Sequence, residues 1–372
     1  MDLEDIAEPL VRLAEALVDQ EAARVLVEPA VRSEGYWFGG GDLVRDSHGC
    51  YWLCGRYRNH GDSRTGVGAG ERGLELAVFR SDSPLGPFEK ALSFSKQDLS
   101  VTGHPVVSIE GASLHLTEMG VELFVSTEKA KPYPDAIHAF QKPGTGYWDI
   151  DVMSAETVGE LDPSRLRPAI GSETPATLHV KDPVAFALPG EEEHTALVFC
   201  SHPFTWASSN TGLAVREAGE SKFQIENFEL MPRGAVWDVA ATRVTDRLAV
   251  PPLGVLADVP PLSLYFYDGA ECLRRLDESE QAVSRPRGYS CEELGGLAVG
   301  YDETFPSIRR LTVDGPLFVS PHGTGCSRYV STLVTGDGIL ATWQQSQDDL
   351  SQPLVGHFLP MAEVERLLSG KS

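Results

Sequence analysis

Four acidic residues carry the chemistry that this sequence suggests. They are Asp42, Glu110, Asp182 and Asp238, and each opens a short apolar segment with the composition of a β-strand. The openings lie about 55 to 75 residues apart, a spacing that suits the blades of a β-propeller with their loops. Carboxylates brought together from successive blades repel one another, so one holds a proton near neutral pH while another stays ionised. Such a pair supplies the acid and the base of glycosidic bond cleavage.

Each acid taken alone has a simpler interpretation, as a turn or cap residue before a strand. The repetition of the pattern favours a shared site. Converging carboxylates would also suit a structural calcium ion on the propeller axis, and such an ion needs no catalysis. The pattern assigns no metal ligands, and cleavage by two carboxyl groups requires no cofactor.

The elements that must position these acids are short strands between two helical ends. Apolar residues recur at helical spacing near the N-terminus and again after Pro360. Between these ends, strand-like segments alternate with turns rich in Gly, Pro, Asp and Asn. We therefore predict an all-β fold: a five-bladed β-propeller over residues 31–360, an N-terminal helical clasp over 1–30 and a short C-terminal helical tail over 361–372.

The repeating unit predicts which residues face the propeller axis. The first strand of each blade lies against the axis, so residues at the same position of successive blades converge on one funnel. The predicted units open at Gly41, Ile109, Val180 and Val236, and the fifth is built from 307–312, 328–334 and 339–344.

Several other side chains are candidates for binding a sugar near these acids. Trp37 and Trp237 lie close to Asp42 and Asp238 in the sequence, and an indole face suits the apolar face of a sugar ring. Arg56 could hold an anion at the mouth. His322, in the polar loop Pro-His-Gly-Thr-Gly, could reach the axis as a sugar contact. The alternatives are packing between blades for the tryptophans and a surface loop for the histidine.

Two segments of the first unit resemble a known family. Residues 42–53 read Asp-Leu-Val-Arg-Asp-Ser-His-Gly-Cys-Tyr-Trp-Leu, and residues 80–88 read Arg-Ser-Asp-Ser-Pro-Leu-Gly-Pro-Phe. Together they look like the first blade of the five-bladed glycoside hydrolases of family 43, whose architecture families 32, 117 and 130 share. The resemblance covers roughly residues 36–345 and implies the propeller fold and a glycosidase activity.

The resemblance also implies roles for individual residues. Asp42 would be the general base of an inverting enzyme or the nucleophile of a retaining one. Asp182, in Lys-Asp-Pro, is similar to the family's third-blade aspartate, which tunes the pKa of the acid or binds sugar hydroxyls. The family's acid is usually a glutamate of the fourth blade, whereas this chain has Asp238 there and Glu110 in the second blade. Either of these two is therefore a candidate for the acid.

Charge excludes two classes of partner. The formal net charge is −23 at pH 7, so the surface repels nucleic acid and anionic lipid. No apolar stretch approaches transmembrane length, and the N-terminus is acidic where a signal peptide would be basic. We expect a cytoplasmic protein whose partner is a small carbohydrate.

The strong acidity also predicts a response to salt. Repulsion among excess carboxylates is screened at high ionic strength, as in a protein adapted to a halophilic environment. The free energy of unfolding should therefore rise between low and molar salt, which denaturant titration at both salt concentrations would measure. A free energy of unfolding that stays flat or falls would contradict the halophilic interpretation.

The sequence thus predicts a glycoside hydrolase acting on a neutral sugar. Two alternatives remain open: a non-catalytic propeller that binds a sugar or an ion, and a glycoside phosphorylase. The motifs of P-loop enzymes, serine hydrolases, zinc proteases and dinucleotide-binding domains are absent from the sequence.

Overall fold

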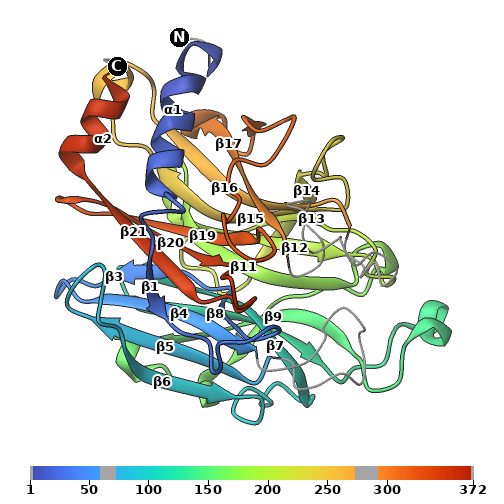
Figure 1. The fold of residues 1–372 in the computed structure, drawn as a ribbon. Coiled ribbons are helices and arrows are strands. Elements are labelled where there is room, and N and C mark those ends of the chain that lie inside the picture. The colour runs from blue at the N-terminus through green and yellow to red at the C-terminus, as the bar shows by residue number, and fades with distance from the viewer. Residues whose placement is uncertain (1–2, 59–72, 273–291, 370–372) are drawn as a thin grey trace.

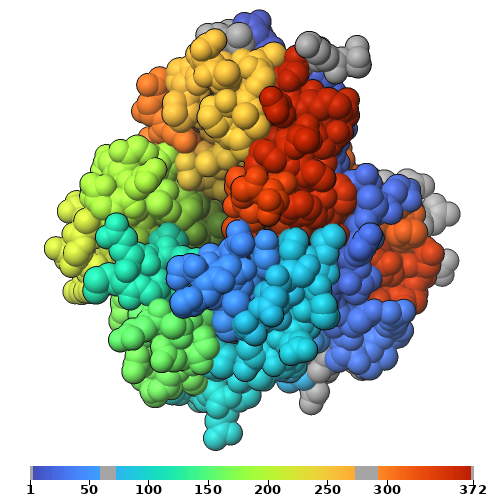
Figure 2. Space-filling view, turned by 90° about the vertical axis from the view of Figure 1, so that its left-hand side faces the viewer, coloured from blue at the N-terminus to red at the C-terminus, as the bar shows by residue number. Residues whose placement is uncertain are grey.

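Five antiparallel sheets surround a common axis in the computed structural model, which describes residues 3–58, 73–272 and 292–369 (Figure 1). In Figure 2 the blades follow one another around one face of the molecule, and red C-terminal residues lie beside blue N-terminal ones. The predicted fold is confirmed: the protein is an all-β, five-bladed propeller with an N-terminal helix, α1 (Leu3–Leu17), and a short C-terminal helix, α2 (Met361–Leu368).

The strands of each blade follow the chain with one exception. Blade 1 contains β2 (Trp37–Gly39), β3 (Leu43–Arg45), β4 (Tyr51–Arg58), β5 (Glu75–Ser81) and β6 (Glu89–Ser95). Blade 2 contains β7 (Val106–Thr117), β8 (Gly120–Lys129), β9 (Tyr147–Ala155) and β10 (Arg167–Ile170). Blade 3 contains β11 (His179–Leu188), β12 (Glu191–His202), β13 (Asn210–Arg216) and β14 (Gln224–Met231). Blade 4 contains β15 (Ala241–Ala249), β16 (Leu262–Ala270), β17 (Leu294–Tyr301) and β18 (Arg309–Arg310).

Blade 5 is the exception, because it joins the two ends of the chain. It contains β19 (Ser327–Val334), β20 (Gly338–Gln345), β21 (Leu354–Pro360) and, as its outer strand, β1 (Arg24–Val27). Strand β1 pairs antiparallel with β21, with Arg24 opposite Gly356. The N-terminal segment therefore supplies both α1 and the strand that closes the propeller.

Two predicted unit boundaries were wrong. The segment 307–312, expected in blade 5, contains β18 and belongs to blade 4. The inner strand of blade 4 begins at Ala241 and not at Val236, because the chain turns just before it: the amide of Gly234 donates to the carbonyl of Asp238 at 3.2 Å.

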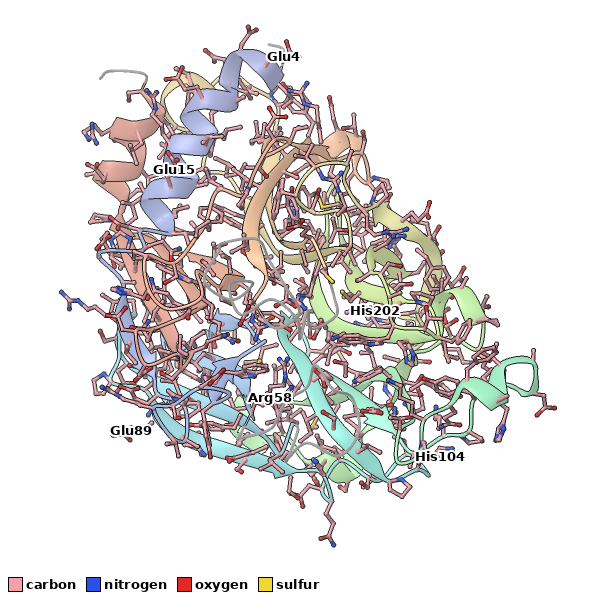
Figure 3. All side chains as sticks on the ribbon, turned by 45° about the vertical axis from the view of Figure 1, so that its right-hand side comes forward. Glu4, Glu15, Arg58, Glu89, His104 and His202 are labelled. Carbon is pink, nitrogen blue, oxygen red and sulfur yellow. The ribbon has the colours of Figure 1, made fainter. Side chains whose placement is uncertain are left out.

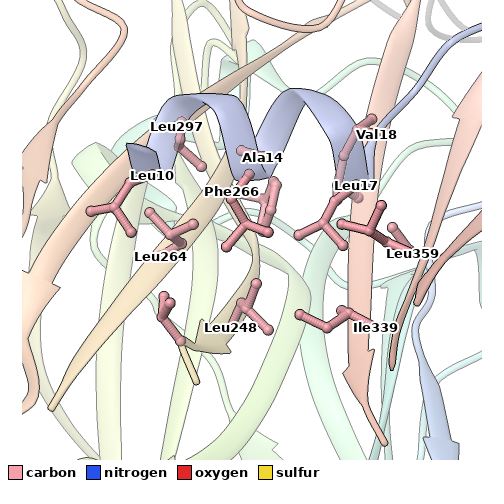
Figure 4. Close-up of a cluster of buried hydrophobic side chains, with 14 of the residues drawn as sticks. Leu10, Ala14, Leu17, Val18, Leu248, Leu264, Phe266, Leu297, Ile339 and Leu359 are labelled. Atoms are coloured by element: carbon pink, nitrogen blue, oxygen red, sulfur yellow. The ribbon is translucent and has the colours of Figure 1, made fainter. Parts of the chain in front are cut away.

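Helix α1 covers the junction of blades 4 and 5. Its apolar face buries Ile6, Leu10, Leu13, Ala14 and Leu17. These side chains pack on residues of both blades (Figure 4), among them Leu248, Leu264, Phe266, Leu297, Ile339 and Leu359. Helix α2 packs against α1 and against blade 5. In the part of the chain that the structure describes, no helix has the length and apolar character needed to cross a membrane.

Candidate active site

The inner strand of every blade is interrupted before its midpoint. The pairing shifts between Ile109 and Ala112 in β7, between Lys181 and Val184 in β11, between Val244 and Asp246 in β15 and between Arg328 and Ser331 in β19. In blade 1 the chain divides at the same place into β2 and β3. A bulge bends a strand and re-aims the side chains beside it, and bulges are common next to active sites.

Five side chains meet around the axis, and we call them the axial ring: Arg56, Glu110, Asp182, Arg243 and Tyr329. The last four lie at or beside these interruptions, whereas Arg56 comes from β4, the second strand of blade 1. The Asp182 carboxylate accepts the amide hydrogen of Gly111 at 3.0 Å and an Arg243 N–H at 3.2 Å. Arg56 lies 3.3 Å from Glu110. Each of the five side chains is buried.

Tyr329 lies between two guanidinium groups of the axial ring. Its hydroxyl accepts from Arg56 at 3.3 Å, and the Arg243 guanidinium lies 4.0 Å from its ring centroid. Asp182 and Tyr329 both adopt positive φ, 53° and 54°. Backbone strain of this kind at non-glycine residues clusters at functional sites.

Asp42 lies beside the axial ring, further along the inner strands than Glu110. Its carboxylate accepts the Ser113 hydroxyl at 2.5 Å and the Leu114 amide at 2.7 Å. Burial raises the pKa of Asp42 to about 6, although these two hydrogen bonds oppose the rise. Asp42 can therefore exchange a proton close to neutral pH.

Glu110 and Asp182 have the opposite electrostatics. Burial alone would raise both pKa values. For Asp182 the positive charges of Lys181, Arg243 and Arg56 outweigh burial, and the pKa falls well below its usual range. For Glu110 the charges of Arg56 and Lys181 likewise lower the pKa. The three acids therefore divide into one that holds a proton readily, Asp42, and two that stay ionised.

A narrow pocket opens among these groups, and all five blades line it. Asp42, Asp182, Arg243 and Tyr329 are in its wall, together with backbone of Gly111. Its volume is about 10 Å³, enough for roughly one water molecule. A water molecule there would lie beside the one carboxyl group of the set that can accept its proton.

The structure does not bring Asp238 into this group. Asp238 lies before β15 and accepts from the Arg310 Nε at 2.9 Å, and Arg310 belongs to β18, the outermost strand of blade 4. The expectation that Asp238 opens the inner strand of blade 4 was wrong, because β15 begins only after the turn at Gly234. Arg243 and Asp246 are the charged groups that β15 places near the axis.

The two predicted tryptophans are both in contact with other groups of the protein. Trp37 is buried, with guanidinium groups of Arg58 and Arg328 each 4.6 Å from its ring centroid. Trp237 is also buried, and its indole N–H donates to the Thr312 carbonyl at 2.9 Å. Their positions match the packing interpretation.

Arg56 and His322 differ in their placement. Arg56 is part of the axial ring, where Figure 3 shows the neighbouring Arg58 toward the middle of the molecule. His322 lies on a loop, partly exposed, with its Nδ1 3.1 Å from Asp348. It is not among the residues that line the axial pocket.

Sequence reasoning found Arg56 but missed the other basic residues of the site, Lys181 and Arg243, and a fourth axial acid. Lys181 stands next to Asp182 in the sequence and lies 3.4 Å from its carboxylate. Asp246 accepts the Thr332 amide at 2.9 Å. Burial and, to a smaller extent, the negative charge of Asp42 raise the pKa of Asp246 to about 7. The signal for Asp246 was its place in the middle of an apolar inner strand.

Asp246 gives a prediction for the pH dependence of stability. Its pKa is higher in the folded protein than in the unfolded chain, so the folded state binds more protons between about pH 4 and 7. Ionisation of Asp246 therefore contributes a loss of stability as pH rises through this window, and Asp246→Asn removes that contribution. We compare the free energy of unfolding of the variant with that of the wild type at each pH. This difference should be more favourable to the variant at pH 8 than at pH 4.5 by on the order of 2 kcal/mol.

Urea unfolding of both proteins at the two pH values measures this change. The exposed Asp258→Asn variant is the matched control, and its difference from wild type should be the same at both pH values. A difference for Asp246→Asn that does not grow with pH would show that Asp246 is ionised without penalty.

The structure has no obvious metal centre in its described part. Among residues 3–58, 73–272 and 292–369, no three His, Cys, Asp or Glu side chains are arranged to hold a metal ion. A calcium ion on the axis stays a prediction, because backbone carbonyls and hydroxyls can also be calcium ligands.

Comparison with known proteins identifies the fold. No family profile matches the sequence, and no curated protein matches it significantly. Among solved structures, one described as a glycoside hydrolase aligns with a TM-score of 0.60 and 11% identity over 96% of this chain and 95% of that one. An α-L-arabinofuranosidase from Lactobacillus brevis aligns with a TM-score of 0.55 and 9% identity over 91% and 93%. A β-1,2-mannobiose phosphorylase from Listeria innocua aligns with a TM-score of 0.53 and 11% identity over 93% and 97%.

Family-43 glycoside hydrolases are also among the similar structures. The chain therefore has the fold of family 43 and of related propeller hydrolases and phosphorylases, as the resemblance implied. At these identities the likeness concerns the fold alone.

Proposed function

We propose that the protein is a glycoside hydrolase that acts on a neutral sugar at the mouth of the propeller. The observation that carries this proposal is the convergence of Asp42, Glu110 and Asp182 from three successive blades, with different tendencies to hold a proton. Glycosidic cleavage requires one protonated and one ionised carboxyl group, so a sugar that displaces Arg56 from Glu110 would have to raise the pKa of Glu110 before the acid step.

Asp42 is the general base in this proposal. Its pKa of about 6 is close to working pH, where a base is most effective. A water molecule in the adjacent pocket would lose its proton to Asp42 as it attacks the anomeric carbon. Asp182, held ionised by Lys181 and Arg243, orients sugar hydroxyls. Its negative charge also influences the pKa values of the neighbouring groups.

Glu110 is the acid in this proposal, since Asp238 lies away from the axis. Its pairing with Arg56 keeps it ionised in the protein without sugar. Entry of the sugar must therefore loosen this ion pair before Glu110 can donate a proton to the leaving oxygen. Arg56 also donates a hydrogen bond to the Tyr329 hydroxyl. This bond can hold the Arg56 guanidinium in place when its pairing with Glu110 is broken.

One observation favours a second function, glycoside phosphorolysis. Arg56, Lys181 and Arg243 gather buried positive charge near the axis of a chain whose net charge is −23. A phosphate ion held by these groups would replace water as the nucleophile. A phosphorylase is also among the structures with this fold.

A panel of nitrophenyl furanosides and pyranosides that carry one to three sugar units, assayed at low and molar salt with and without phosphate, tests the proposal. A hydrolase releases nitrophenol from at least one glycoside without phosphate. Release that depends strictly on phosphate would establish the phosphorylase instead. Absence of release across the panel from folded protein that binds a sugar would contradict both enzymes and leave a sugar-binding propeller.

A further inference from the structure

A second cavity lies in blade 2, outside the axial ring. We call it the blade 2 cavity, and its wall includes His104, Lys129, Lys131, Tyr147, Asp149 and Glu173. These residues come from the segment just before β7, the end of β8 and the residues after it, the start of β9 and the segment after β10. Figure 3 places His104 in blade 2, well apart from Arg58 near the axis.

The cavity opens at the same ends of the strands as the axial ring. Thr127 of β8 pairs with Ile109 on one side and with Asp149 on the other. Asp149 therefore lies level with Ile109, the residue before Glu110. It is two strand spacings, or roughly 10 Å, further from the axis. A substrate bound at the axis can extend in this direction.

The size and lining of the cavity suit a sugar unit. Its volume is about 490 Å³, within the range of small-molecule sites. Two lysines meet there at one carboxylate: Lys129 lies 3.5 Å from Asp149, and Lys131 also pairs with it. Ammonium groups donate and carboxylates accept hydrogen bonds, so such a pair can bind adjacent sugar hydroxyls.

The backbone keeps this carboxylate reachable. Gly171 lies so close to it that a Cβ there would come within 2.7 Å of the Asp149 Oδ1. Asp149 and Lys129 are both more than nine-tenths buried, which fixes their positions. The two lysines face three carboxylates, those of Asp149, of Asp151, which lies 2.7 Å from Lys129, and of Glu173 at the rim. This excess of negative charge favours a neutral ligand over an anion.

A row of aromatic rings in contact runs from β9, next to the cavity wall, to the funnel. The ring of Trp148, next to Asp149, lies 4.9 Å from that of His179 and 5.9 Å from that of Trp206. Trp206 stacks on His202 at 4.9 Å and carries the Lys181 ammonium at 5.0 Å from its centroid. Lys181 is the partner of Asp182, so the row forms a rigid wall between the two sites.

We propose that the blade 2 cavity is a carbohydrate subsite that binds a distal neutral sugar of an oligosaccharide whose scissile bond lies at the axial ring. This inference rests on the proposed function for the position of the scissile bond. It identifies the substrate as an oligosaccharide of at least three units, rather than a simple monosaccharide glycoside.

Calorimetric titration with linear xylo-, arabino- and manno-oligosaccharides of one to six units tests this inference. Affinity of the wild type should rise at about three units. Lys131→Ala should weaken binding of the longer members about tenfold, because a hydrogen bond to a charged group is lost, and change monosaccharide affinity less than twofold. Lys222→Ala, on an exposed turn at the other end of blade 3, is the matched control and should bind all members as wild type does.

Glu173→Trp is a second variant, which fills the exposed rim without disturbing the buried pair and should weaken the same longer members. An affinity that does not depend on chain length, or equal losses for short and long sugars in Lys131→Ala, would overturn the inference. Because binding is measured, length dependence without turnover would refute the hydrolase and keep the subsite. Turnover without length dependence would refute the subsite alone.

Discussion

Replacing Asp42 by asparagine should lower kcat/KM for the best glycoside by about 10² to 10⁴, the usual contribution of a general base. Asparagine has the shape of aspartate and keeps an oxygen for the Leu114 amide, so folding and sugar binding should persist. The loss should therefore appear in kcat while the dissociation constant of the sugar changes little. Initial rates and calorimetric titration of the same preparation measure both quantities.

The control for this variant is Asp82→Asn. Asp82 belongs to the same blade, but its side chain is 79% exposed and pairs with Arg80 on the surface. Its kcat/KM should stay within twofold of wild type. Full activity in Asp42→Asn would remove Asp42 from the mechanism and with it the proposed role of the adjacent pocket.

Replacing Arg243 by methionine should lower the free energy of unfolding by about 3 to 5 kcal/mol, the cost of breaking a buried ion pair from one side. The Arg243 guanidinium lies within 3.6 Å of Asp182, Asp268 and Glu293. Methionine has a similar length and is apolar, so these buried carboxylates would lose a counter-charge without a large cavity forming. Urea unfolding at neutral pH measures the change.

Arg309→Met is the surface counterpart. Arg309 is 45% exposed and lies 3.5 Å from an exposed Glu4, and pairs of this kind contribute about 0 to 1 kcal/mol. A loss in Arg243→Met no larger than in Arg309→Met would show that the axial carboxylates do not depend on Arg243.

The architecture could be predicted because blades repeat. An acid at the start of an apolar strand, found at Asp42, Glu110 and Asp182, gave the blade spacing and placed all three at or beside the axis. The same rule failed at Asp238. A turn and an inner strand have similar residue types near 234–241, and only pairing with β16 shows where the strand begins.

The basic partners could not be predicted in the same way. Arg243 and Arg328 lie within their strands and no motif surrounds them. Their importance depends on which blades become adjacent when the propeller closes. Closure itself depends on β1, four residues long, whose pairing with β21 links segments more than 300 residues apart. A short strand after a helix has no signal for so distant a partner.

The pH profile of kcat/KM for a dinitrophenyl glycoside tests the central claim most directly, because this leaving group departs without a proton and the profile then reports the ionisation of the base in the free enzyme. A base is active when ionised, and burial raises the pKa of Asp42 to about 6. We predict that kcat/KM rises tenfold per pH unit below about pH 6 and levels off above it. Activity that is independent of pH between 4 and 7, or that falls as pH rises through 6, would contradict Asp42 as the base.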